Sequence, residues 1–337
     1  MADVIDRLLA SDEPSIRWKV RSRVLGEPEE SLADLRREIK DSPRVRTLLS
    51  LRDETGRIMK QNQTYKKWKG AHWVFAHLAD IGYPEGDPEL VPMRDQVMDF
   101  SMGFVVRRKF TEGEWPSRLN GRARFCASLP GNALFSTVAL GLVNDRCQEF
   151  AELLIRTQWP DSGWNCDKNP DAHVSSFWET LIPLRGLIAY AQFTGDDQAR
   201  EAADRAAEVF LSRRLFRRIS DGEVMNPQFT RLHYPCYWRY DILFGLKVMA
   251  VGGFISDPRC ADALDLLESK RLPDGGWPAE ERFYAVTKDL SGRGETVSWG
   301  ITSKTRMNEW VTADALYVLR AARRPILFPA LQYSNTP

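Results

Sequence analysis

The sequence lacks the features that mark several large classes of protein. Lysine plus arginine (47) nearly balance aspartate plus glutamate (46), which leaves a net charge of +1 and no long run of one sign. Nucleic-acid binding needs a basic patch or stripe, so we expect no nucleic-acid partner. No apolar stretch approaches the ~18 residues of a membrane-spanning helix, and the chain does not start with a cationic segment leading into an apolar one. We therefore expect no integral membrane segment and a cytoplasmic location.

Cysteine is also scarce. The five cysteines are odd in number and widely spread, which argues against a disulfide framework and leaves free thiols or metal ligands. Strand-like alternation of apolar and polar residues is too short to predict a sheet, and no linker rich in proline, glycine or serine divides the chain. These absences predict a single all-α domain.

What the sequence does contain is an internal repeat. A turn ending in Gly-Trp occurs at Asp161-Ser-Gly-Trp164 and at Asp274-Gly-Gly-Trp277, with weaker versions at 112–115 and 221–224. These turns are spaced by roughly 50 to 60 residues, a period typical of stacked helical hairpins.

Two kinds of helical pattern alternate with these turns. An amphipathic stretch, such as 147–155 or 260–267, precedes the turn and predicts an outer helix. A stretch that is apolar nearly all round precedes each outer one and predicts a buried, inner helix. The predicted inner helices are 71–78, 133–140, 181–188, 242–249 and 311–319.

Hairpins of this kind cannot bury their apolar faces alone, so neighbours must stack into an open solenoid or a closed ring. We favour the ring, because buried inner helices need a common centre. The predicted organisation is one domain over residues 1–337. Within it we expect a capping hairpin at 1–60, repeated hairpins at 61–325 and a tail at 326–337.

The segment Gln158-Trp-Pro-Asp-Ser-Gly-Trp164 resembles the Gln-Trp repeat of squalene and oxidosqualene cyclases, and 271–277 has the same length with Arg271 in the glutamine place. The resemblance, to the squalene cyclase and protein prenyltransferase superfamily, implies an (α/α)6-type toroid with an apolar central cavity that holds isoprenoid chains. The acid motif that protonates squalene and the Asp-x-Cys zinc pair of prenyltransferases are both missing. The resemblance therefore implies a fold and does not identify a reaction.

The predicted topology brings all loops that lead into inner helices to one end of the ring. Cys126, Cys166 and His173 lie in such loops and have the composition of a zinc site with three protein ligands and water, or four ligands. Inner-helix N-termini at this mouth would also favour an anionic group. The competing interpretation is that the thiols are small buried hydrophobes and the histidine an ordinary surface group.

Other residues at the expected mouth are candidates for catalysis or substrate binding. The candidate general acids and bases are His233, Asp241, Glu179 and Glu309, although Asp241 and Glu309 are equally well placed to cap helices. Aromatic packing is the alternative role for most of the candidate substrate contacts. These candidates are Trp68, His72, Arg124, Tyr237 and Trp310.

From the sequence we expect an enzyme of the terpene cyclase and prenyltransferase-like superfamily. Its substrate would be a small hydrophobic or anionic molecule, isoprenoid-like, bound in the toroid cavity, with zinc as the candidate cofactor. Two alternatives from other classes remain open: a non-catalytic helical-repeat binding module, and a polysaccharide-acting toroid that places Glu179 and Asp241 opposite each other in a polar cleft.

Overall fold

The all-α class predicted from the sequence is confirmed by a computed structural model, which describes residues 3–106, 118–287 and 294–326. Helix accounts for 54% of the structure, and the two strands in the described part are two residues long each. The weak turn expected at 112–115 and residues 327–337 of the expected tail lie outside the described residues.

The helices follow one another along the chain with short 3-10 segments between them. The α-helices are α1 (Val4–Leu9), α2 (Pro14–Trp18), α3 (Ala33–Lys40), α4 (Pro43–Leu49), α5 (Ala71–Asp80), α6 (Val91–Val106), α7 (Ser128–Ala139), α8 (Arg146–Thr157), α9 (Phe177–Thr194), α10 (Asp197–Leu211), α11 (Ile242–Gly252), α12 (Ala261–Ser269) and α13 (Glu309–Ala321). The other elements are the π-helix η1 (Lys19–Leu25), the 3-10 helices η2 (Glu29–Leu32), η3 (Gln61–Gln63), η4 (Pro88–Leu90), η5 (Pro227–Thr230) and η6 (Pro258–Cys260), and the antiparallel strands β1 (Arg118–Leu119) and β2 (Arg122–Ala123).

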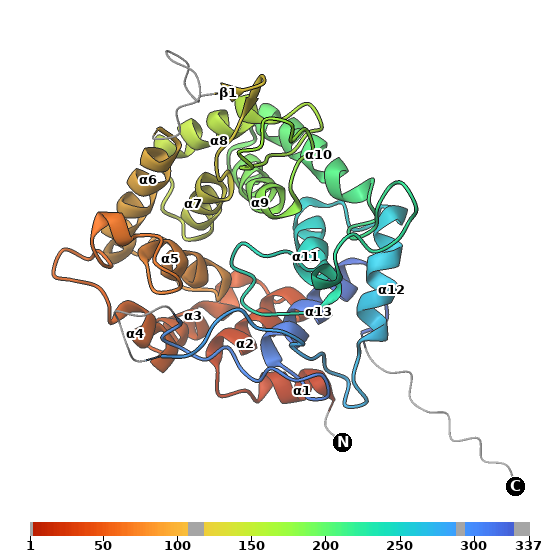
Figure 1. Cartoon of the computed structure of the whole chain (residues 1–337). Coiled ribbons are helices and arrows are strands. Elements are labelled where there is room, and N and C mark those ends of the chain that lie inside the picture. Colours follow the sequence, from red (N-terminus) through yellow and green to blue (C-terminus); the bar gives the residue numbers. More distant parts are fainter. Residues whose placement is uncertain (1–2, 107–117, 288–293, 327–337) are drawn as a thin grey trace, which may run out of the picture.

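The helices lie in two rows. Figure 1 shows α5, α7, α9, α11 and α13 on the inside, with α6, α8, α10 and α12 outside them. Each inner helix contacts the next inner helix along the chain. Helix α13 contacts η1 and α2, and further contacts lead from α2 through α3 and α4 to α5, so the series returns to its first member.

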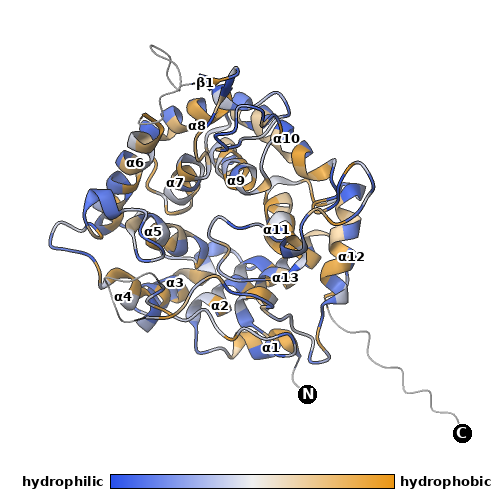
Figure 2. Cartoon of the chain, in the orientation of Figure 1, coloured by the Kyte–Doolittle hydropathy of each residue, from blue (hydrophilic) through white to orange (hydrophobic). Residues whose placement is uncertain are grey.

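The two rows differ in hydropathy as the sequence predicted. The inner helices are apolar over most of their surface, whereas α8 and α10 carry a polar face toward solvent (Figure 2). The inward face of α10 is built of alanines, which lets it approach α9 closely. The buried alanines of α10 are Ala199, Ala202, Ala203, Ala206 and Ala207.

Two glycines allow the closest inner contact, between α7 and α9. A Cβ atom on Gly186 would lie 2.5 Å from the carbonyl oxygen of Gly131, and one on Gly131 would lie 2.7 Å from the backbone of Pro183. Backbone cannot yield as a flexible side chain can, so both positions require glycine. The tight contact fixes the middle of α9 against the first turn of α7, and so sets the position of the two helices whose starts carry the candidate site.

The two clearest Gly-Trp turns make the same set of hydrogen bonds. The indole N–H groups of Trp164 and Trp277 donate to carbonyl oxygens of the preceding outer helix, at 3.2 Å and 2.8 Å. Their backbone N–H groups donate to the hydroxyls of Thr180 and Thr312 on the following inner helices. Each turn therefore ties one outer helix to the next inner helix, which is the physical basis of the repeat.

Gln158 adds a connection between outer helices. Its side-chain nitrogen donates to the carbonyl oxygens of Ser162, in the turn, and Ala202, in α10. Arg271, in the equivalent place of the later repeat, donates to the carbonyl of Gly275 and lies over the ring of Trp277.

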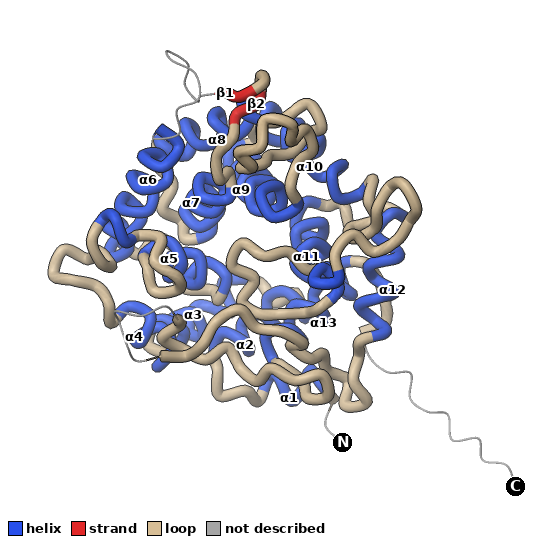
Figure 3. Tube along the Cα trace, viewed as in Figure 1, coloured by secondary structure: helices blue, strands red, loops and turns tan. Residues whose placement is uncertain are grey.

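Long loops cover the end of the molecule where the inner helices begin (Figure 3). Buried apolar residues from Val4 to Leu319 form one continuous core cluster. None of the helices in the described part of the chain combines the length and the apolar character that a membrane crossing requires.

Candidate functional site

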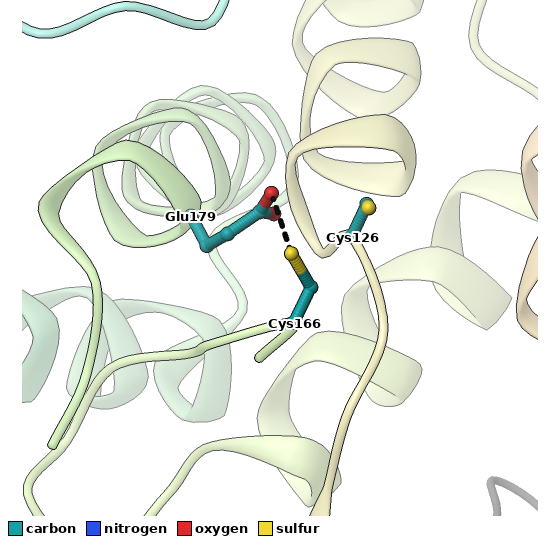
Figure 4. A group of neighbouring side chains, drawn as sticks. All are labelled: Cys126, Cys166 and Glu179. Atoms are coloured by element: carbon teal, nitrogen blue, oxygen red, sulfur yellow. Dashed lines mark hydrogen bonds between the residues drawn. The ribbon is translucent and has the colours of Figure 1, made fainter. Parts of the chain in front are cut away.

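Two thiols and a carboxylate meet where α7 and α9 begin. Cys126 precedes α7, Cys166 lies between α8 and α9, and Glu179 is in the first turn of α9. One ligand atom from each lies within 4.8 Å of the others, and the Cys166 Sγ is 3.4 Å from Glu179 Oε1. Figure 4 shows the Glu179 carboxylate directed at the two sulfur atoms. Two of the three predicted zinc ligands are thus brought together, with Glu179 in the third place.

The carboxylate of Glu179 is held in position by the backbone of α7. The N–H group of Ser128 donates to Glu179 Oε2 at 3.0 Å, which leaves Oε1 toward Cys166. The hydrogen bond to Cys126, burial and the negative charge of Glu179 raise the pKa of the Cys166 thiol. Both cysteines are half-buried and Glu179 is buried.

Arg124, predicted as a substrate contact, shapes the loop that carries Cys166. Its side chain is 1% exposed and donates hydrogen bonds to main-chain carbonyl oxygens of the 167–172 segment. It also lies over the ring of Trp159, whose indole N–H donates to the carbonyl of Ala123. The N–H groups of the guanidinium are therefore bound to main-chain carbonyl oxygens, and Arg124 positions the two segments that supply the thiols.

His173, the third predicted zinc ligand, is not in this cluster. It is exposed, and its Nδ1 lies 2.9 Å from the carbonyl oxygen of Asp171. The segment that Arg124 draws inward ends at Ala172, one residue before His173. This arrangement could not be predicted from sequence patterns, because the loop conformation depends on an arginine more than forty residues earlier.

His233 and Asp241, both candidate catalytic residues, form a second group with Cys236. The His233 Nδ1 lies 3.0 Å from Asp241 Oδ2, which also accepts the backbone N–H of His233. The other oxygen, Oδ1, accepts the backbone N–H of Phe244 and so caps α11. Burial acts to lower the pKa of His233, but Asp241, the carbonyl of Arg231 and the charge of Glu281 together outweigh it, and the pKa is raised. Asp241 is fully buried, so it does not face Glu179 across a polar cleft.

The aromatic candidates at the expected mouth stack on one another. The ring centroids of Trp68 and Tyr237 are 3.6 Å apart and the rings are nearly parallel, and Trp238 also stacks on Trp68, at 5.0 Å. The Tyr237 hydroxyl donates to the buried carboxylate of Glu295, which also lies 3.3 Å from His77 Nε2.

The remaining candidates are spread over other contacts. His72 is buried against Asn132, and burial lowers the pKa of its imidazole to about 3. Trp310 stacks on Tyr234. Glu309 begins α13 and accepts a hydrogen bond from Ser11.

A closed ring of charges, which the sequence analysis missed, lies among the inner helices. Lys19 contacts Asp80 and Asp314 at 3.1 Å and 2.9 Å, and Lys247 contacts the same two carboxylates at 2.9 Å and 2.8 Å. Arg185 and the hydroxyl of Tyr234 also bind Asp80. We call Lys19, Asp80, Lys247 and Asp314 the central charge ring. It joins η1, α5, α11 and α13.

The pKa values in the central charge ring follow from burial and from the opposite charges in contact. Burial, only partly offset by the two carboxylates, lowers the pKa of Lys19 to about 8. Burial also opposes the charged forms of Asp80 and Asp314, but Lys19 and Lys247 hold the pKa of each carboxyl below its usual value.

The pocket beside this ring differs from the large apolar cavity expected from the sequence. Its volume is about 50 Å³, room for a few water molecules. Its lining includes the charged residues Asp80, Arg185, Lys247 and Asp314 and the segment from Tyr234 to Tyr237. A chain of several isoprene units does not fit in this space.

No protein-family model matches the chain, and a comparison with curated proteins finds no match.

Proposed function

We propose that the chain is a zinc-dependent enzyme built on an (α/α)6-type toroid, with Cys126, Cys166 and Glu179 as the protein ligands of the metal. The observation that carries the proposal is the spacing of the ligand atoms. With a Zn–S bond of about 2.3 Å, a Zn–O bond of about 2.0 Å and tetrahedral angles, sulfur and oxygen ligands lie about 3.5 Å apart. The separation between Cys166 Sγ and Glu179 Oε1 is 3.4 Å.

A zinc ion also accounts for two features of the cluster. Two thiols and a carboxylate in a half-buried site repel one another once the thiols ionise, and the ion removes this repulsion. The hydrogen bond from Ser128 to Glu179 is the outer contact that orients a ligating carboxylate.

Three protein ligands are typical of catalytic zinc, which keeps one position for water or substrate. Bound zinc lowers the pKa of a coordinated water, alcohol or thiol and so supplies a nucleophile near neutral pH. The proposed reaction class is hydrolysis or group transfer by such a nucleophile. The proposed substrate is a small hydrophobic or anionic molecule that reaches the cluster without entering the central pocket, because that pocket is small and charged.

The toroid, and kinship with the cyclase and prenyltransferase superfamily, are part of this proposal. They are supported by the contact series that returns from α13 to α5, by the matched hydrogen bonds of Trp164 and Trp277, and by the bridge from Gln158 to α10.

The test is zinc content in protein purified without added metal. Wild type should carry about one zinc per chain, and Cys166→Ser and Glu179→Gln should lose most of it, since each removes one of three ligands. Cys147→Ala is the matched control, because Cys147 is fully buried in α8 and belongs to neither ligand group. Folded wild type without zinc, or variants that keep it, would refute the metal site.

A non-catalytic binding module is the second candidate, and the observation that favours it is the side-chain-filled centre. In that case zinc would be structural, with a closed coordination sphere. The visible spectrum of cobalt-substituted protein distinguishes catalytic from structural zinc. Added azide should change this spectrum if one coordination position of the metal is open, and an unchanged spectrum would favour the structural role.

A further inference from the structure

A second pocket lies at the opposite ends of the inner helices from the thiol cluster. Its volume is about 320 Å³, in the range of small-molecule sites. The C-terminal parts of α5, α7 and α11 contribute Ala79, Ala139 and Val251, and the N-terminal region contributes Trp18 and Arg23. The floor is formed by Arg185 and Lys247, which also border the central pocket. We call this space the basic pocket.

Positive charge around the basic pocket exceeds negative charge. The central charge ring beneath it pairs two lysines with two aspartates, and Arg185 adds a further cation on Asp80. At the rim, Arg36 is paired with Glu29 and Glu85. The group therefore has four carboxylates and five cations, which leaves one positive charge in excess. The carboxylates are Asp80, Asp314, Glu29 and Glu85, and the cations are Lys19, Lys247, Arg185, Arg36 and Arg23.

Arg23 is the cation that lacks a carboxylate. Within residues 3–106, 118–287 and 294–326, its guanidinium contacts the rings of Trp18 and Tyr317, at 5.0 Å and 5.9 Å, and forms no ion pair or hydrogen bond. Its charge nevertheless acts on the ring below, where it lowers the pKa of Asp80 and of Asp314.

A buried hydrogen-bond donor in the same wall is also without an acceptor. Trp18 is 4% exposed, and its indole N–H has no partner in the described part of the chain. Burying an N–H group without an acceptor is costly, and an unsatisfied donor beside an unpaired cation is the arrangement that an anion completes.

Two further features narrow the ligand. The C-terminal ends of α5, α7 and α11 bring partial negative charge to this pocket, which disfavours a phosphate dianion relative to a ligand with a single negative charge. The walls between the charged groups are apolar, with Phe135, Val248 and Val251 among them.

We propose that the basic pocket binds a small organic monoanion, a carboxylate with an apolar body, through Arg23, Arg185 and the indole N–H of Trp18. This site is separate from the thiol cluster and does not depend on bound zinc. The ligand's carboxylate would pair with the Arg23 guanidinium and accept a hydrogen bond from the Trp18 indole N–H. Its alkyl or aryl body would lie along Phe135 and Val251.

The test is calorimetric titration of the full chain with octanoate. Octan-1-ol, which has a similar apolar body without the charge, and inorganic phosphate, which has the charge without the body, serve as ligand controls. Octanoate should bind saturably, and neither control should bind or compete at the same concentration.

Variants assign the binding to this pocket. Arg23→Gln should weaken octanoate binding about tenfold or more, because it removes a charge-assisted contact, and Trp18→Phe should weaken it severalfold. Arg21→Gln, on the same π-helix with its partner Glu27 at the surface, should bind like wild type. Each variant is checked for a wild-type circular dichroism spectrum.

Equal binding of octan-1-ol, or octanoate binding unchanged in both Arg23→Gln and Trp18→Phe, would overturn the proposal. Phosphate that bound as tightly as octanoate would overturn the apolar-body assignment. Loss of zinc in the cysteine variants leaves these results unaffected, so the two proposals fail or succeed separately.

Discussion

Replacing Asp314 by asparagine tests how the inner helices are held together. The change keeps the size of the side chain and removes the charge that faces both Lys19 and Lys247, at 2.9 Å and 2.8 Å. Removing one partner of a buried ion pair costs about 3–5 kcal/mol, because the remaining charge stays buried without compensation. Asp314→Asn should therefore lower the free energy of unfolding by about that amount if both lysines stay charged.

Lys19 sets a limit to this loss. Its pKa is about 8 in the folded wild type and falls further when Asp314 is neutralised, so the variant sheds the proton of Lys19 at a lower pH. For each unit by which the pKa of Lys19 is lower in the variant than in wild type, the variant regains about 1.4 kcal/mol of stability relative to wild type as pH rises toward 8. The penalty should therefore be larger at about pH 6 than at about pH 8.5.

Urea unfolding followed by circular dichroism at both pH values measures this difference. The double variant Lys19→Met, Asp314→Asn removes one charge of each sign and should recover at least about 1 kcal/mol relative to the sum of the single variants. An Asp314→Asn protein within about 1 kcal/mol of wild type at both pH values, or a double variant with no recovery, would refute the role of the central charge ring.

Three further outcomes are expected. Lys19 and Lys247 hold the pKa of Asp80 and of Asp314 below the value near 3.9 of the unfolded chain. The stability that these carboxylates provide is therefore fully present above about pH 4 and is lost as pH falls through their folded pKa values. The urea midpoint should drop below about pH 4, and it should drop less in Asp80→Asn. Arg124→Met should expose the 167–172 segment to proteolysis and weaken zinc binding about tenfold or more, whereas Arg122→Met should change neither. Asn308→Ala should cost about 1–2 kcal/mol in urea unfolding, because Asn308 caps α13 through the N–H groups of Trp310 and Val311; a loss below about 0.3 kcal/mol would contradict the capping role.

Hydrophobic periodicity predicted most of the fold. The stretch 71–78 corresponds to α5 (Ala71–Asp80), 311–319 to α13 (Glu309–Ala321) and 147–155 to α8 (Arg146–Thr157). These helices were predictable because an element that is apolar nearly all round must be buried, whatever its neighbours are. Their ends extend by a few residues, since caps depend on local hydrogen bonds that periodicity does not register.

The site was only partly predictable. The meeting of Cys126 with Cys166 follows from topology, because both precede inner helices. The choice of Glu179 over His173 does not, because it depends on how Arg124 folds the intervening loop.

The central charge ring has a signal in the sequence. Lys247 and Asp314 are isolated charges in stretches that are otherwise apolar, Ile242 to Met249 and Val311 to Leu319. A charge in a buried helix needs an opposite charge nearby, so each of these residues predicts a buried partner. The partners could not be named, because Lys19 and Asp80 come from distant parts of the chain.

X-ray absorption at the zinc edge of the purified full chain tests the central claim most directly. The account predicts two sulfur ligands at about 2.3 Å and two oxygen ligands at about 2.0 Å, one from Glu179 and one from water, with one sulfur lost in Cys126→Ser. A chain that binds no zinc, or a spectrum dominated by nitrogen and oxygen ligands without sulfur, would contradict it.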